Sequence, residues 1–252
     1  MFNRILILCS TILIFFVNFL HSDTFNAQIL SFKPIIDKLY FSFNYKKLEE
    51  INSELREIKT KTVDDIFLSN YYQGINNYCL GRIYYNYDKE KAFNKFELAL
   101  YNFKKCNNLK KDPEVIAMIS ASYGKLSSLS VLKAIFYGMS AKEYIEEAYK
   151  LDSKNPKVLI VAATHLMHTP EFYGGDKKKS RELLNKVIDS LEYKDNFKIN
   201  WANYAEAYAY LAQLEILENN QDKAKSFMKK ALELSPNYGF VKYDLEKQIK
   251  AK

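Results

Sequence analysis

The segment from Thr169 to Ser180, TPEFYGGDKKKS, concentrates residue types that bind phosphate: two adjacent glycines, three lysines and a serine. Glycines before a helix can expose backbone N–H groups to an anion. A nucleotide-binding loop, however, needs G-x4-G-K-[ST] after a buried strand, and the preceding VLIVAATHLMH has the alanines of a helix. The segment is therefore predicted to be a joint between two helices, in which Gly174 and Gly175 turn the chain and Asp176 caps the next helix.

Histidines are the next residues with chemical potential. His165, His168 and Glu171 lie three residues apart in succession, and two histidines one helical turn apart can bind zinc. The third ligand would have to come from beyond the end of that helix, and the remaining histidine, His21, lies next to the apolar N-terminal segment. We therefore predict no metal site and no cofactor.

Catalytic groups are equally scarce. After the N-terminal segment the cysteines are Cys79 and Cys106, both at the spacing of a helical core. On the two helices of a hairpin they would be more than about 10 Å apart along the axes, beyond the reach of a disulfide. Two buried free thiols are expected. The sequence offers no Ser/His/Asp or Cys/His set, so we predict no catalytic residues and no enzymatic activity.

Composition indicates the class of fold. The chain has 252 residues, 48% of them hydrophobic, with only seven glycines and five prolines. So few turn residues favour long helices over a β-sandwich, and the fold is predicted to be all-α. The net charge of +7 comes from lysines spread along the whole chain, and no nucleic-acid-binding motif accompanies them. Nucleic acid is not an expected partner.

The N-terminus is typical of an export signal. Arg4 precedes an almost continuous apolar run over residues 5–20, which is followed by the polar residues HSDT. The run is shorter than the ~20 residues that span a bilayer comfortably. We expect residues 1–22 to be a cleaved signal peptide, with an uncleaved anchor as the alternative, and residues 23–252 to be one helical domain that is exported to the periplasm or envelope.

The final third contains two helical patterns that meet at ENNQD and stop at Pro236. Their spacing resembles the tetratricopeptide repeat, with Glu215 as the main departure from its aromatic position. Three more such units are visible upstream. The matching positions are Leu80, Gly81, Tyr84, Ala92, Phe96 and Ala99; Tyr123, Gly124, Ala141, Ile145 and Ala148; Leu159, Ala162, Ala163, Ser180, Leu184 and Val187; and Tyr208, Leu211, Ala212, Ala224, Met228 and Ala231.

Three further segments complete the array. Residues 127–140, SSLSVLKAIFYGMS, are an insertion expected to pack back as an extra short helix. Residues 32–58 are expected to form an N-terminal helical hairpin, and residues 239–252 a C-terminal capping helix. The apolar face of that cap is expected to bury Phe240, Val241, Tyr243, Leu245 and Ile249.

The resemblance implies a right-handed α-solenoid of about five tetratricopeptide-like helical hairpins. The order of segments is similar to exported bacterial tetratricopeptide proteins that carry a P-x-F-x-G-G-D loop. The plan also resembles the periplasmic tetratricopeptide component associated with tripartite ATP-independent transporters. This resemblance implies that the protein is a non-enzymatic scaffold for protein–protein interaction. The alternative is a transport-accessory or small-molecule-binding protein that partners a periplasmic solute-binding protein.

The repeat register predicts which side chains line the inner surface. Tyrosines, an arginine and a lysine there would suit an extended peptide or an acidic segment. The predicted ligand- or peptide-binding residues are Tyr78, Arg82, Tyr85, Lys125, Thr164 and Gln213. Phe172 and Tyr173 have two interpretations. One of them could pack against its own hairpin, or the pair could contact a partner at the edge of the array.

Overall fold

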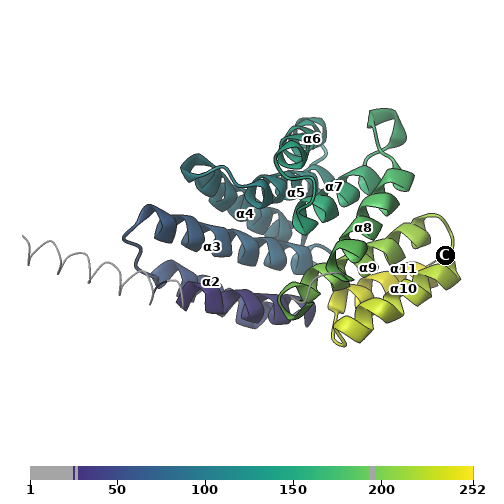
Figure 1. The fold of residues 1–252 in the computed structure, drawn as a ribbon, viewed down its shortest axis with the longest axis horizontal. Helices are drawn as coiled ribbons and strands as arrows, with labels where there is room; N and C mark the ends of the chain where they lie inside the picture. The colour runs from purple at the N-terminus through teal and green to yellow at the C-terminus, as the bar shows by residue number, and fades with distance from the viewer. Residues whose placement is uncertain (1–24, 26–27, 193–196, 252) are drawn as a thin grey trace, which may run out of the picture.

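The computed structural model describes residue 25, residues 28–192 and residues 197–251 (Figure 1). The expected signal peptide, residues 1–22, lies outside this range. Within it the chain is helical throughout and contains no strand, as expected from the composition. None of the helices in the described part is long and apolar enough to cross a membrane.

Short turns connect the helices, and an unlabelled helix over residues 28–41 comes first. The labelled elements are α2 (Tyr45–Glu57), α3 (Val63–Tyr84), α4 (Lys89–Leu109), α5 (Pro113–Leu129), α6 (Ala134–Leu151), α7 (Pro156–His168), η1 (Glu171–Tyr173), α8 (Lys177–Glu192), α9 (Phe197–Leu217), α10 (Gln221–Leu234), η2 (Phe240–Leu245) and α11 (Glu246–Lys250).

Helix starts are specified locally by polar caps. Thr62 begins α3 with a capping box, because its hydroxyl accepts the Asp65 N–H while the Asp65 carboxylate accepts the Thr62 N–H. Asp112 and Asn155 cap α5 and α7 through a side-chain oxygen that accepts backbone N–H groups of the first turn. Each is followed by a proline at the first helical position. These caps fix where each hairpin turns.

Neighbouring helices pack in pairs: α3 with α4, α5 with α6, α7 with α8, and α9 with α10. The short turns make the two members of each pair antiparallel. Small residues allow close approach, since a Cβ on Gly81 would lie 2.8 Å from the Phe96 ring. Ser180 donates a hydrogen bond to the Ala163 carbonyl across the α7–α8 contact. Nearly all the positions predicted from the repeat spacing are buried or half-buried.

The expected extra helix in residues 127–140 does not exist. Helix α5 continues to Leu129 and α6 begins at Ala134, so the additional residues lengthen both helices around a tight turn at 130–133. The physical reason is that Ser127 hydrogen-bonds the Ala134 carbonyl across this turn, which closes the hairpin directly. The apolar side chains of the segment remain on the surface.

The first and last described segments pack against each other. Tyr238 lies 4.2 Å, centroid to centroid, from Phe41, and Gly239 lets the Phe43 ring approach its backbone. Phe240 is buried in the cap as expected, but Tyr243 is exposed. The expectation for Tyr243 was wrong because, at about 100° per residue, its side chain lies nearly opposite those of Val241 and Leu245, and the π-helical turn η2 does not bring it back.

The α7–α8 joint has the predicted construction. Gly174 adopts a left-handed backbone with φ of 94°, and a Cβ on Gly175 would lie 1.8 Å from the Thr169 carbonyl oxygen. Asp176 Oδ1 accepts the Lys179 N–H at 2.8 Å, which confirms the cap. The expectation that Phe172 or Tyr173 packs against the hairpin was wrong. Their side chains are 92% and 64% exposed because η1 carries them outward, and the joint projects at the upper right of Figure 1.

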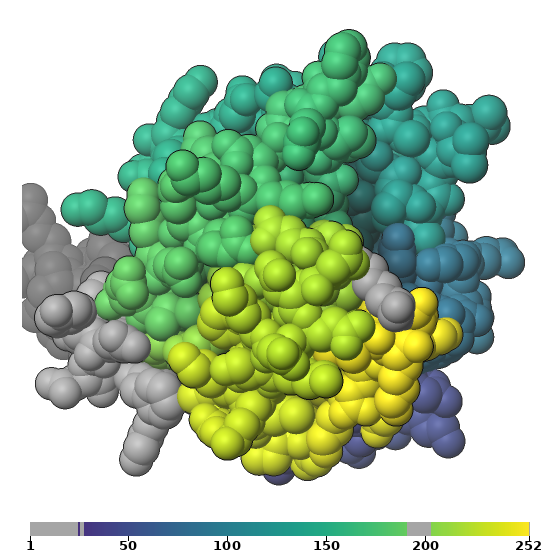
Figure 2. Space-filling model, turned by 90° about the vertical axis from the view of Figure 1, so that its right-hand side faces the viewer, coloured from purple at the N-terminus to yellow at the C-terminus, as the bar shows by residue number. Residues whose placement is uncertain are grey.

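The surface view places this joint beside the middle helices. In Figure 2 the green surface of the α7–α8 region and the teal surface of the middle helices occupy the upper rim together. Helix α5 also packs on α7. Since α5 and α7 are each antiparallel to α6, their C-terminal ends lie at the same edge of the molecule.

Two glycine substitutions should have opposite effects. Gly175→Ala forces the Thr169 carbonyl to move and should lower the free energy of unfolding by about 1–3 kcal/mol. Gly124→Ala lies within α5, where a Cβ meets nothing within 4 Å, and should raise it by about 0.5–1 kcal/mol. Urea unfolding at constant m-value measures both. Equal changes in the free energy of unfolding for the two variants would contradict the close contact described for Gly175.

Candidate functional site

Four helices carry the six residues predicted to line the inner surface. Tyr78, Arg82 and Tyr85 belong to α3 or its C-terminal end, Lys125 to α5, and Thr164 and Gln213 to α7 and α9. Helix α5 contacts α7, and α7 contacts α9. The structure divides the six between a closed ionic centre at Arg82 and a more open cluster at Lys125.

Arg82 lies at the closed centre of the molecule. Its side chain is 8% exposed, and Nη1 lies 3.0 Å from Oε1 of Glu206 on α9. The other oxygen of Glu206 accepts from Nζ of Lys157 on α7 at 2.8 Å. One buried carboxylate is therefore shared by two cations from two other helices, and we refer to these three residues as the Glu206 triad.

Aromatic rings surround the arginine of the Glu206 triad. The guanidinium carbon lies 5.2–5.4 Å from the ring centroids of Tyr40, Tyr210 and Phe240. These rings come from the helix over residues 28–41, from α9 and from η2. The guanidinium thus holds the two ends of the described chain together and is not free to meet a ligand.

The titration of Glu206 shows which effect dominates in the triad. Burial by itself raises the pKa of this carboxyl, but Lys157 and Arg82 outweigh burial, and the pKa is lowered below its ordinary value of 4.5. A carboxylate with a lowered folded-state pKa stabilises the fold above pH 4.5 and loses this contribution as the pH falls through that pKa. The triad is therefore a structural element that acid weakens.

Lys125 has a different environment, because no carboxylate of the described chain lies within ion-pair distance of it. Its Nζ is 5.1 Å from the centre of the Tyr85 ring, and Nζ of Lys89 is 3.6 Å from the same ring. Burial lowers the pKa of Lys125 to about 7, helped by Arg82 and Lys89 and opposed by Asp244. Lys125 is thus a half-buried amine that Asp244 influences without forming an ion pair with it.

His168 and Gln213 complete this environment. Burial, together with the charges of Lys125 and Arg82, lowers the pKa of His168 to about 4, and the hydrogen bond with the adjacent Gln213 opposes this shift. The Oε1 atom of Gln213 is buried and has no hydrogen-bond partner of good geometry. We call Tyr85, Lys89, Lys125, His168 and Gln213 the Lys125 cluster.

The other two predicted residues stand apart from the Lys125 cluster. Thr164 donates its hydroxyl hydrogen bond to the Val161 carbonyl of its own helix. Tyr78 packs edge-on against Phe96, with ring centroids 5.5 Å apart, and lies towards Arg82. Their positions are those of packing residues.

Sequence patterns missed the partners that define both environments. Glu206 is the lone acid in the run YAEAYAYLAQL, and such an isolated acid among small apolar residues is a usable signal of a buried pair. Lys157 and Lys89 carry no such signal, because exposed lysines look identical in the sequence. His168 was visible only as a possible metal ligand.

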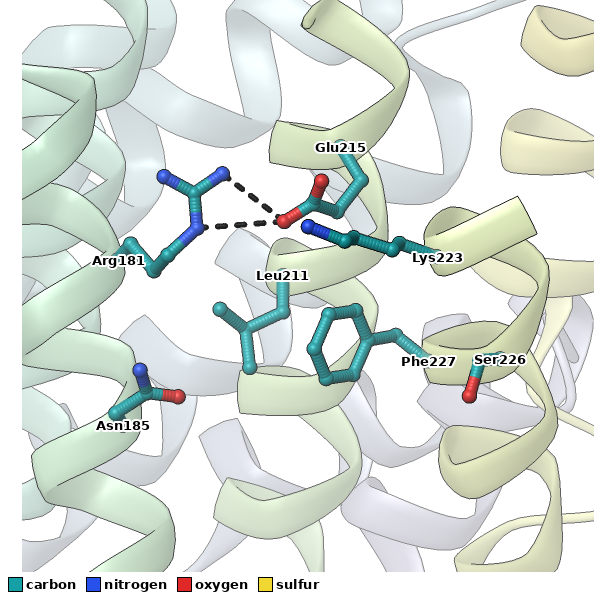
Figure 3. A pocket seen from close by; sticks show the side chains of 7 residues that line it. All are labelled: Arg181, Asn185, Leu211, Glu215, Lys223, Ser226 and Phe227. Carbon is teal, nitrogen blue, oxygen red and sulfur yellow. Dashed lines mark hydrogen bonds and ion pairs between the residues drawn. The ribbon is translucent and has the colours of Figure 1, made fainter. Parts of the chain in front are cut away.

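A separate pocket of about 370 Å³ lies between α8, α9 and α10 (Figure 3). Arg181 donates to the buried Glu215 at 2.9 Å and also pairs with Glu218, while Asn220 donates to the second oxygen of Glu215. Lys223 points towards the same carboxylate from α10. Glu215, the departure from the repeat pattern, is thus held by Arg181, and the main charges of the pocket are already paired.

Cysteines and metal ligands add no further chemistry. Cys79 and Cys106 are buried free thiols, as predicted, and burial raises the pKa of Cys106 to about 12. A thiol that stays protonated is a poor nucleophile. Across the described residues, no group of three or more His, Cys, Asp or Glu side chains could hold a metal ion.

Removing the carboxylate of the Glu206 triad should be severe. Glu206→Gln leaves Arg82 and Lys157 buried without a counter-charge, so the free energy of unfolding should fall by about 3–5 kcal/mol. Glu146→Gln is the matched control, because its contact with Lys142 is 4.0 Å long and exposed, and it should change stability little. Chemical denaturation measures the free energy of unfolding of both variants. Similar losses in the two would show that the Glu206 triad contributes no more to stability than an exposed ion pair.

Lys125 should make stability depend on pH. Its folded-state pKa of about 7 lies below the ordinary value of 10.5, so the unfolded chain binds more protons between these two pH values. Lys125→Met should therefore be more stable than the parent chain at about pH 6, with the advantage shrinking towards about pH 10. Thermal unfolding across this range tests the expectation, and a pH-independent difference would refute it.

No known family model matches the chain, and no curated protein is significantly similar to it. The tetratricopeptide resemblance therefore rests on residue spacing alone. What the structure adds is an all-helical fold of paired helices with two charged environments on its inner helices. Any functional conclusion depends on the contacts of those environments.

Proposed function

We propose that the protein is an exported, non-enzymatic scaffold, a right-handed α-solenoid of about five tetratricopeptide-like hairpins, that binds an acidic segment of a partner protein. The observation that carries the proposal is Lys125, a half-buried amine that has no carboxylate at ion-pair distance and lies beside the half-buried ring of Tyr85. The export signal and the repeat spacing support the location and the architecture.

A carboxylate is the group that this cluster lacks. Bringing one to Lys125 would offset the hydration energy that the ammonium group loses on burial, and charge-assisted hydrogen bonds are stronger than neutral ones. The Tyr85 face offers apolar area for the stem of an acidic side chain.

The same site couples binding to protonation. A bound carboxylate raises the pKa of Lys125, so above about pH 7 the amine must take up a proton when the ligand binds. The groups that face Lys125 are Arg82, Lys89, His168 and Asp244. His168, with a pKa of about 4, stays neutral above about pH 6, so it does not mask the effect.

The alternative, a transport-accessory or small-molecule-binding role, rests on the pocket between α8 and α10. Arg181 and Glu215 in that pocket already satisfy each other. Lys125 instead has no carboxylate within ion-pair distance, so its cluster is the better binding site for a peptide.

Calorimetric titration with a peptide of about ten glutamates tests the proposal, with the matching glutamine peptide as the neutral probe. Lys125→Met should weaken binding of the glutamate peptide at least about tenfold at about pH 6, which corresponds to a lost charged hydrogen bond. In the parent chain the affinity should fall as the pH rises from about 7 to about 9.

The control variant is Lys154→Gln, which removes the same charge from an exposed position in the α6–α7 turn, at the opposite edge. Arg82 is not substituted, because it belongs to the Glu206 triad. If Lys154→Gln weakens binding as much as Lys125→Met, the peptide binds through general electrostatic attraction and the proposed site is wrong. Equal affinity of the parent chain for the glutamate and glutamine peptides would also show that the proposed site is wrong.

A further inference from the structure

The turn between α5 and α6 presents an apolar ridge to solvent. Its side chains are 67–95% exposed, the largest values falling at the tip of the turn. The apolar ridge consists of Val131, Leu132, Ile135, Phe136 and Met139. Large apolar side chains at this exposure, gathered in one short segment, mark an interaction surface.

Helical spacing places these side chains on one face. Residues 131 and 132, then 135 and 136, then 139 repeat about every four positions along the turn and the first part of α6. The buried residues of α6, in contrast, are Ala141, Ile145 and Ala148, which lie in its later turns. The beginning of α6 therefore packs on the end of α5 through Tyr137, while its outer apolar face is uncovered.

A second apolar projection lies at the same edge. Phe172 and Tyr173 extend from the α7–α8 joint, and the C-terminal ends of α5 and α7 share an edge because these helices are parallel neighbours. The interaction of Lys125 with His168 confirms that the two ends are close. Lys142 of α6 likewise acts on His165, which brings α6 next to the end of α7.

The charge around both projections is positive. No aspartate or glutamate occurs between Glu114 and Glu143, whereas this stretch contains Lys125, Lys133 and Lys142. The joint adds three consecutive lysines at 177–179, which outnumber its two acids, Glu171 and Asp176. An occupant of this edge must offer an apolar interior and negative charge at its surface.

We propose that this edge docks on the surface of a bilayer that contains anionic lipids. The apolar ridge and Phe172 enter the boundary between headgroups and acyl chains, and the lysines contact lipid phosphates. Side chains more than 90% exposed at the tips of two turns need no complementary protein surface in order to be buried in lipid. The proposal does not depend on the Lys125 cluster or on its ligand.

Tryptophan reporters in the full chain test this docking separately from any effect of the apolar N-terminal run. The parent chain has one tryptophan, Trp201, which supplies the baseline. Leu132→Trp and Phe172→Trp place reporters on the two projections, and Leu151→Trp places one at the opposite end of α6, where the side chain is also exposed. Vesicles of phosphatidylcholine, with or without about 30% phosphatidylglycerol, contain brominated acyl chains as quenchers.

The expected result is blue-shifted, quenched emission at positions 132 and 172 with the anionic vesicles, and little change at 151. Phe136→Ser in the Leu132→Trp chain should weaken vesicle binding measured by that reporter at least about tenfold. Replacing Lys133 and Lys142 together by Gln should also weaken it, whereas Lys154→Gln should not.

Two results would overturn the proposal. The first is vesicle binding in which the reporters at 132 and 172 are quenched no more than the reporter at 151, because the N-terminal run would then be the contact. The second is self-association without vesicles, detected by sedimentation velocity and abolished by Phe136→Ser, which would assign the ridge to a second copy of the chain.

Discussion

The carboxylate of Glu206 is the constraint on which the rest of the structure depends. It lies between a guanidinium from α3 and an ammonium from α7, and the rings around that guanidinium come from the first and last described segments. Three charges in a buried site are tolerable only when each is compensated. The packing of several helices is therefore fixed by one acid. No single hairpin could supply both of the cations that pair with Glu206.

The Lys125 cluster lies beside this compensated centre and lacks its compensation. Burial of an amine without a counter-ion costs stability, and a fold can retain such a group when a ligand offsets the cost. The contrast between Lys157, which has its carboxylate, and Lys125, which does not, separates a structural cation from the cation proposed to bind a ligand on a neighbouring helix.

Local patterns predicted the helices, their caps and most buried positions, because these depend on residues a few places apart. The cap at Asp176 and the contact of Gly81 with Phe96 are of this kind. The pairing of Arg82 with Glu206 spans 124 residues, and spacing within one hairpin carries no information about it. For the same reason the register placed Arg82 on an open surface, where the structure places it in an ionic centre. Tyr243 was misplaced because the prediction counted every apolar residue of the cap as buried, although helical spacing puts Tyr243 nearly opposite Val241 and Leu245.

The contact between Phe41 and Tyr238 has a consequence for how the chain reaches its folded state. In an open array each hairpin can fold on its neighbour, and the process can begin anywhere. Here the central charges are compensated only after the last helices arrive, so the early hairpins carry an unneutralised arginine until synthesis is nearly complete. Closure of so long a loop is slow. In the exported protein proposed above, such a chain would remain incompletely folded until late, the state in which a polypeptide passes most easily through a narrow channel.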